Sequence, residues 1–232
     1  MIDLSRKKRI LVTGASGSIG SAIASHYRDL EWEVYGQYAR TEPTVVGITS
    51  IKKDLLATGS GRELVESVKP HLVINCAANQ DVFPLDDPEL SVKSADQLRV
   101  NLLAPLEIMS AAARIGARLC INISSLEALR ARPGHGVYGA SKAALESLTR
   151  TAAVELAPMR VIGLRLGLIS RPGIEEAWPE GVKSWNQLVP LKRMGTPLEV
   201  ARVIEKIASD DFQWATGTTI DFDGGASASA GW

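Results

Sequence analysis

A serine, a tyrosine and a lysine in the middle of the sequence have the types and spacing needed to move a proton on and off an oxygen atom. Tyr138 and Lys142 are four positions apart, so on a helix their side chains lie about one turn apart on the same face. A nearby ammonium favours the phenolate, so we expect Lys142 to lower the pKa of Tyr138 from about 10. Ser125 would hold the same substrate oxygen. Together the three groups predict acid–base chemistry at an alcohol or carbonyl oxygen.

A glycine-rich turn near the start of the chain is placed to bind a phosphate. The apolar run 9–13 precedes Gly14, Gly17 and Gly20, and the pattern over 19–30 predicts a helix. A strand, turn and helix in this order aim backbone N–H groups and a helix N-terminus at an anion. The glycine spacing differs from the common dinucleotide fingerprint G-x-G-x-x-G, so a plain tight connection is the alternative.

The residues after the second predicted strand bear on the choice of nucleotide. The run 33–38 predicts a strand with no Asp or Glu at its end, and Arg40 follows just beyond it. At this place in a dinucleotide-binding sheet, an acidic residue binds ribose hydroxyls and an arginine suits a 2′-phosphate. We therefore expect NADP(H) to be favoured over NAD(H). A solvated loop arginine is the alternative.

Strand-like and helix-like segments alternate along the rest of the chain. Further strands are expected at 46–52, 71–78, 117–125, 160–168 and 218–222, and further helices at 61–68, 95–115, 137–156 and 196–209. This alternation predicts a single α/β domain over residues 1–232: a Rossmann-type, doubly wound parallel sheet of about seven strands with helices on both faces. Ligands of such sheets bind at the carboxyl ends of the strands. The residues that fall there are Gly14, Arg40, Asp54, Cys76, Ser125 and Leu168.

The segment from about 170 to 190 is irregular and rich in proline. It is expected to cap the site. It contains Trp178 and Trp185, which favour an apolar or ring-bearing substrate, although either side chain could equally be packing.

The composition excludes several classes of function. The chain has 232 residues, of which 45% are hydrophobic and 22% charged, and its formal net charge is zero, so no general field attracts nucleic acid or an anionic membrane. The basic start Met1–Arg9 is followed by no apolar signal core, and no run is long enough to span a bilayer. Cys76 and Cys120 lie in apolar runs and are interpreted as buried free thiols, with no disulfide and no metal site. We expect a cytoplasmic protein that acts on a small molecule.

With these residues in view, the chain resembles the short-chain dehydrogenase/reductase family from Thr13 to Gly225. Ser125, Tyr138 and Lys142 match the family's catalytic serine and its Tyr-x-x-x-Lys pair, and Asn101 matches the asparagine that completes the set. The segments similar to the 3-oxoacyl-reductase-like branch are Pro190–Gly195, Glu199–Ala201, Thr216–Gly217 and Asp223–Gly225.

The resemblance implies an NADP(H)-dependent oxidoreductase that interconverts a carbonyl and a secondary alcohol by hydride transfer. In this scheme Tyr138 is the acid and base, Ser125 orients the oxygen, Lys142 holds the nicotinamide ribose, and Asn101 anchors a water. The implied cofactor-binding residues are Gly14, Ser16, Ser18, Ile19, Gly20, Arg40, Asp54, Leu55, Cys76, Ala77, Ala78, Tyr138, Lys142 and Leu168.

The resemblance also implies a homodimer or homotetramer. Members of the family usually associate through two central helices, which correspond here to 95–115 and 137–156. Small side chains on these helices would allow close packing. They are Ala111–Ala113 and Ala140, Ala143 and Ala144.

Three departures from the family pattern leave alternatives open. Ser18 replaces the middle glycine of Thr-Gly-x-x-x-Gly-x-Gly, the run Asn75–Ala78 replaces Asn-Asn-Ala-Gly, and Leu166 replaces the proline of Pro-Gly. The first two lean toward the extended branch, so one alternative is a reductase or epimerase of a nucleotide-linked sugar. The other is a non-catalytic dinucleotide-binding sensor, against which the intact Ser-Tyr-Lys set argues.

Overall fold

Seven parallel strands form one sheet in this computed structural model, which describes residues 7–229. The order across the sheet is β3-β2-β1-β4-β5-β6-β7, as predicted for a doubly wound fold. The order reverses between β1 and β4, which opens the crevice where such sheets bind their ligands. The strands are β1 (Arg9–Val12), β2 (Glu33–Tyr38), β3 (Thr49–Lys52), β4 (Leu72–Asn75), β5 (Leu119–Ser125), β6 (Arg160–Leu166) and β7 (Thr219–Phe222).

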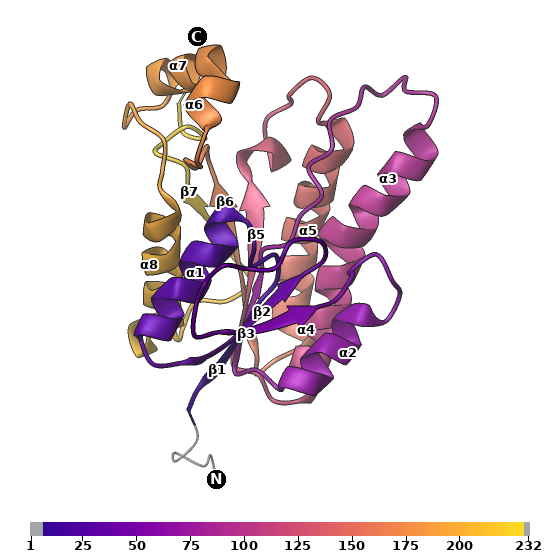
Figure 1. The fold of residues 1–232 in the computed structure, drawn as a ribbon, viewed down its shortest axis with the longest axis vertical. Coiled ribbons are helices and arrows are strands. Elements are labelled where there is room, and N and C mark those ends of the chain that lie inside the picture. The colour runs from indigo at the N-terminus through magenta and orange to yellow at the C-terminus, as the bar shows by residue number, and fades with distance from the viewer. Residues whose placement is uncertain (1–6, 230–232) are drawn as a thin grey trace.

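Helices cover both faces of the sheet (Figure 1). On one face lie α1 (Ser18–Asp29) and α8 (Pro197–Ala208), and on the other lie α2 (Ser60–Val68), α4 (Ala104–Arg114) and α5 (Gly136–Glu155). Successive strand residues point to opposite faces. Ile10 therefore packs with Ile204 of α8, whereas Leu11 packs with Ile108 of α4. Strands buried on both faces are apolar throughout, which explains the runs in the sequence.

The helix expected at 95–115 is interrupted and begins earlier than predicted. Helix α3 (Leu90–Leu98) leads into a π-helical turn (Arg99–Leu103), and α4 follows. The chain between β4 and residue 95 is thus helical from Leu90 onward. Pro105 lies in the first turn of α4, where its missing N–H costs little. The π turn widens the helix at Asn101, which is wholly buried.

The segment after β6 forms two short helices, α6 (Ile174–Ala177) and α7 (Pro179–Leu188), at the end of the molecule opposite the start of β1 (Figure 1). Trp185 is half-buried and packs against Leu126, Val189 and Ala226, so packing accounts for part of its surface. Trp178 lies under the Arg132 guanidinium, 4.5 Å from it. Two short 3-10 turns complete the elements, at Leu126–Ala128 and Asp210–Phe212.

Within residues 7–229, none of the helices combines the length and apolar character required to cross a membrane.

Candidate active site

The glycine turn joins β1 to α1 and touches the end of β4. Thr13 Oγ1 accepts hydrogen bonds from the backbone N–H groups of Cys76 and Ala77, both at 3.0 Å. Gly14 has a φ of 67°, and a Cβ there would lie 2.8 Å from Ala77 Cα. A Cβ on Gly20 would lie 2.2 Å from the Gly14 oxygen. The altered spacing therefore still builds a turn in which these two positions admit no side chain.

Helix α1 presents its N-terminus beside this turn. It begins at Ser18 with Gly17 as N-cap, no side chain caps it, and its first turn carries no acidic residue. The N–H groups of that turn and the positive end of the helix dipole favour an anion. Ser16 is exposed next to them, and Ile19 is half-buried. These features fit the pyrophosphate of a dinucleotide.

Gln37 holds the turn in shape and was not recognised as a site residue from the sequence. Its side chain is 2% exposed. Oε1 accepts a hydrogen bond from Gly14 N (2.9 Å), and Nε2 donates to Lys53 O (2.6 Å). The sequence does show a glutamine inside an apolar strand. Because buried polar groups are normally hydrogen-bonded, Gln37 could have been recognised from this pattern as a residue with a specific partner.

The other predicted cofactor residues surround the same edge of the sheet. Arg40 is exposed just after β2, and Asp54 is exposed after β3. Leu55 instead packs into the core between the sheet and α2, so its side chain is structural. Ala78 is exposed after β4, and the Leu168 carbonyl accepts a hydrogen bond from Gly195 N (3.0 Å).

Ser125, Tyr138 and Lys142 come together where β5 ends and α5 begins. Ser125 is the last residue of β5 and lies close enough to the Tyr138 hydroxyl to act on its pKa, while its own Oγ accepts a hydrogen bond from Glu127 N at 3.2 Å. Gln80, from the loop after β4, donates its Nε2 hydrogen to Tyr138 Oη at 3.2 Å. Lys142 Nζ donates to Ile123 O at 2.8 Å and lies 5.7 Å from the centroid of the Tyr138 ring. Tyr138 is 6% exposed and Lys142 is 3% exposed.

The pKa of Tyr138 is shifted in the direction opposite to the expectation. Burial raises it to about 12, although hydrogen bonds from Gln80 and Ser125 act to lower it. Lys142 does not offset the burial because its ammonium is directed to the Ile123 carbonyl. Burial lowers the pKa of Lys142 itself to about 8. Both shifts arise because burial away from water disfavours the charged form of each side chain.

Asn101 connects the loop after β4 to α5. It accepts a hydrogen bond from Asn79 N (2.8 Å) and donates to Asn79 O (2.9 Å). Its Nδ2 also donates to Ser141 Oγ at 3.1 Å, and that hydroxyl donates to Tyr138 O at 2.7 Å. Asn101 thereby fixes the backbone on which Gln80 and Tyr138 stand.

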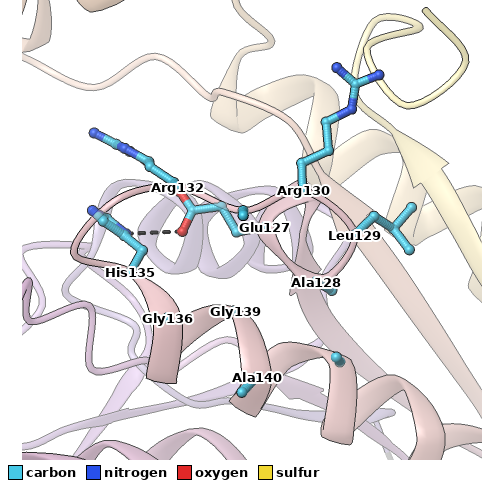
Figure 2. Close-up of a pocket in the computed structure, with 11 residues that line it drawn as sticks. Glu127, Ala128, Leu129, Arg130, Arg132, His135, Gly136, Gly139 and Ala140 are labelled. Atoms are coloured by element: carbon cyan, nitrogen blue, oxygen red, sulfur yellow. Dashed lines mark hydrogen bonds and ion pairs between the residues drawn. The ribbon is translucent and has the colours of Figure 1, made fainter. Parts of the chain in front are cut away.

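A cavity of about 280 Å³ lies on the other, exposed face of the first turns of α5 (Figure 2). Its lining includes Glu127, Arg130, Arg132 and His135, and the Glu127 carboxylate lies 2.9 Å from His135 Nδ1. Gly139 and Ala140 form its floor, whereas Tyr138 and Lys142 do not contribute to it (Figure 2). We therefore place the candidate chemistry at the buried face of α5 and not in this cavity.

A parallel sheet with a glycine turn at its switch point, and with Ser125, Tyr138 and Lys142 at the neighbouring strand end, is typical of a dinucleotide-binding oxidoreductase. The chain belongs to the short-chain dehydrogenase/reductase family, because the family model described as Enoyl-(Acyl carrier protein) reductase matches residues 14–227.

Comparisons with known proteins agree on this family. The chain is 29% identical to the L-xylulose reductase of Caenorhabditis elegans, covering 95% of this chain and 96% of the relative. It is also 29% identical to the (3R)-3-hydroxyacyl-CoA dehydrogenase of Homo sapiens, covering 95% of each chain. A solved structure titled as a short chain dehydrogenase/reductase family protein superposes with a TM-score of 0.85 at 27% identity, covering 95% of this chain and 97% of that one. The chain is an oxidoreductase that acts on alcohol and carbonyl groups, in a family that uses NAD(P)(H).

Proposed function

We propose that the protein interconverts a ketone or aldehyde and an alcohol with NADP(H), using the group formed by Ser125, Tyr138 and Lys142. The observation that supports this proposal is the position of Tyr138, in the first turn of α5, beside Ser125 at the end of β5, next to the glycine turn. A proton donor and a second hydroxyl at the strand ends would lie where ligands of such sheets bind, which supports the proposal.

Each residue has a separate task in the proposed reaction. A nicotinamide dinucleotide, when bound, supplies the hydride. Tyr138 gives its proton to the carbonyl oxygen and is neutral and ready to do so at physiological pH, since its pKa is raised. Ser125 donates to the same oxygen and orients it. Lys142 is placed to hold ribose hydroxyls, and Asn101 keeps the backbone around Tyr138 in position.

Arg40 supports the preference for NADP(H). Its guanidinium is exposed at the end of β2, and no acidic residue of β2 occupies the strand end that would face the ribose. A guanidinium suits a phosphate monoester because it presents several N–H donors in one plane. Titration calorimetry with NADPH and NADH tests this preference directly, and equal affinities would contradict it.

The activity is tested by following NADPH oxidation with a panel of carbonyl compounds. The panel includes a ketose and a 3-oxoacyl thioester, which correspond to the substrates named for the relatives above. Turnover of any carbonyl supports the proposal. Tightly retained cofactor with no net consumption of added NADPH indicates the nucleotide-sugar alternative, and binding with no turnover across the panel indicates the sensor.

We also propose that the protein forms a homodimer or homotetramer through α4 and α5. The alanine face expected on α4 needs correction, because Ala111 and Ala112 are buried in the core of the subunit, whereas Ala140 and Ala143 of the face expected on α5 are exposed. The exposed large apolar residues are Leu103 and Leu106 before and on α4, and Val154 on α5. A monomer in light scattering at micromolar concentration would contradict this assembly.

A further inference from the structure

The side-chain amide of Gln80 is hydrogen-bonded to the Tyr138 hydroxyl, the group proposed to give its proton to the substrate. Its Nε2 donates to Tyr138 Oη at 3.2 Å, and the residue is exposed whereas Tyr138 is only 6% exposed. A substrate oxygen that receives the Tyr138 proton must lie within hydrogen-bond reach of Oη. The Gln80 amide therefore lies beside the position that the substrate must occupy.

The loop that carries Gln80 is held on both sides. Before it, Asn79 exchanges two backbone hydrogen bonds with the buried Asn101. After it, the wholly buried Gln97 donates to the carbonyl of Asp81 at 3.0 Å, as well as to that of Asn79 at 3.3 Å. Phe83 N donates to Gly134 O at 3.0 Å. The position of Gln80 over Tyr138 is thus fixed by buried groups.

The groups around the Tyr138 hydroxyl and ring are polar. Gln80 hydrogen-bonds to the hydroxyl, Ser125 lies beside it, and the His135 ring stands edge-on to the tyrosine ring with 6.2 Å between centroids. Trp185 packs into a cluster of its own with Leu126, Val189 and Ala226. This environment suits a substrate that is polar next to its reacting carbon.

A primary amide carries two N–H donors and a carbonyl acceptor. When a substrate oxygen takes the hydrogen bond that Tyr138 donates, Tyr138 Oη still accepts from Gln80, and the amide has its second N–H and its carbonyl oxygen left to bind the substrate. A hydroxyl on the carbon next to the reacting carbon can bind them, since a hydroxyl both donates and accepts. An unsubstituted ketone leaves the amide without this partner.

We propose that Gln80 is a substrate-binding residue that recognises an oxygen on the carbon adjacent to the reacting one, so that the substrates are α-hydroxy ketones and the corresponding vicinal diols. The inference rests on the proposed function. In the reduction, a C–H bond forms as hydride passes from the reduced nicotinamide to the carbonyl carbon. The carbonyl π bond breaks, its oxygen takes the Tyr138 proton, and the adjacent hydroxyl is unchanged.

The test compares 3-hydroxy-2-butanone with 2-butanone as probes, using NADPH and the full chain. We expect the wild type to prefer the hydroxy ketone, and Gln80→Leu to lower kcat/KM for it by about 10- to 100-fold, because a site built to bind a hydroxyl loses that much when the partner is removed. For 2-butanone, which lacks the second oxygen, we expect Gln80→Leu to lower kcat/KM by less than about threefold. Asp81→Asn, an exposed change on the same loop, is the matched control and leaves both values unchanged.

Equal losses on the two ketones would overturn the inference, since Gln80 would then act on Tyr138 alone, and so would no loss on either. Calorimetry on the complex with NADP⁺ separates this result from failure of the proposed function. If the wild type reduces neither ketone, the proposed reduction is contradicted for these probes. The inference then stands only if 2,3-butanediol binds the wild type at least about tenfold more tightly than 2-butanol and Gln80→Leu removes the difference.

Discussion

Asn101 and Asn79 exchange two hydrogen bonds, in which the backbone N–H of Asn79 donates to the Asn101 side chain and its carbonyl accepts from it. The π turn at Arg99–Leu103 brings Asn101 to this position. These two hydrogen bonds hold the π turn between α3 and α4 against the loop that carries Gln80. They give Asn101 a structural task that the spacing of residues in the sequence does not reveal.

Asn101→Leu should weaken both the fold and the activity. The variant leaves the N–H of Asn79 without a partner and its C=O with Gln97 alone, and an unsatisfied group costs about 1–3 kcal/mol when buried. We expect a clear fall in the free energy of unfolding, measured in urea, and a fall in kcat/KM of at least about tenfold. Asp86→Asn, exposed on the same loop, is the control. An Asn101→Leu variant with wild-type stability would contradict the role given to this residue.

Arg40→Ala should reduce the affinity for NADPH and leave that for NADH unchanged. A charge-assisted contact to a phosphate contributes about 1.5–3 kcal/mol, which corresponds to at least a tenfold change in Kd. Calorimetry on the two cofactors measures it. Arg62→Ala, which removes an exposed arginine of α2, is the matched control. Losses of equal size for both cofactors would show that Arg40 does not read the 2′-phosphate.

The buried Lys142 should make the stability of the fold depend on pH. Its pKa is about 8 in the folded chain against an ordinary value of 10.5, so between these values the unfolded chain holds a proton that the folded chain has lost. The contribution of Lys142 to the free energy of unfolding therefore rises with pH across this window, whereas the buried thiols of Cys76 and Cys120, whose pKa values burial raises, act in the opposite sense above pH 9. Tyr138 also acts in the sense opposite to Lys142, and only above pH 10, because its folded pKa is raised to about 12.

Lys142→Met removes the titrating group and should be more stable than the wild type at pH 7. The difference should shrink steadily between pH 8 and pH 10, as the wild-type lysine loses its proton. Urea unfolding at a series of pH values below 10 measures this. A difference that stays constant with pH would mean that the burial of the ammonium is compensated by its bond to Ile123.

Removing only one partner of the ion pair between Glu146 and Arg165 should lower the free energy of unfolding. The guanidinium donates to both carboxylate oxygens at 2.9 and 2.6 Å, and the side chains are 7% and 11% exposed. Ser124 also donates to Glu146. Glu146→Leu leaves Arg165 with Asp221 alone, and we expect a loss of about 3 kcal/mol in the free energy of unfolding.

The double variant with Glu146→Leu and Arg165→Met tests the reason for that loss. Replacing both partners of a buried pair by apolar side chains is often close to neutral. The double variant should recover most of the stability. If it loses as much as the two single variants together, Glu146 and Arg165 act independently.

Local patterns in the sequence predicted the strands, and the helix and strand end that carry the candidate catalytic residues. Apolar runs located the strands because strands buried on both faces have no polar side to show. The spacing of Tyr138 and Lys142 placed them on one helix face, and Ser125 fell at a strand end. These features depend on neighbours in sequence.

The remaining parts of the site depend on contacts between distant segments. Lys142 donates to Ile123 O because α5 packs against β5. The four-residue spacing of Tyr138 and Lys142 therefore could not predict the direction in which the pKa of Tyr138 is shifted. Gln80 stands in a polar loop, and only the bonds from Asn101 and Gln97 place it over Tyr138. Trp185 is compatible with a pocket or a core by residue type alone, and only the structure shows that it is half-buried against Leu126, Val189 and Ala226.

The central claim is that the Tyr138 hydroxyl delivers the proton. Tyr138→Phe keeps the ring that packs in the site and removes only the hydroxyl. Single-turnover reduction of a carbonyl substrate by bound NADPH measures the effect most directly. We predict a rate lower by about 10²- to 10⁴-fold, with a Kd for NADPH within about threefold of the wild type. A Tyr138→Phe variant that reduces the substrate at the wild-type rate would contradict the account.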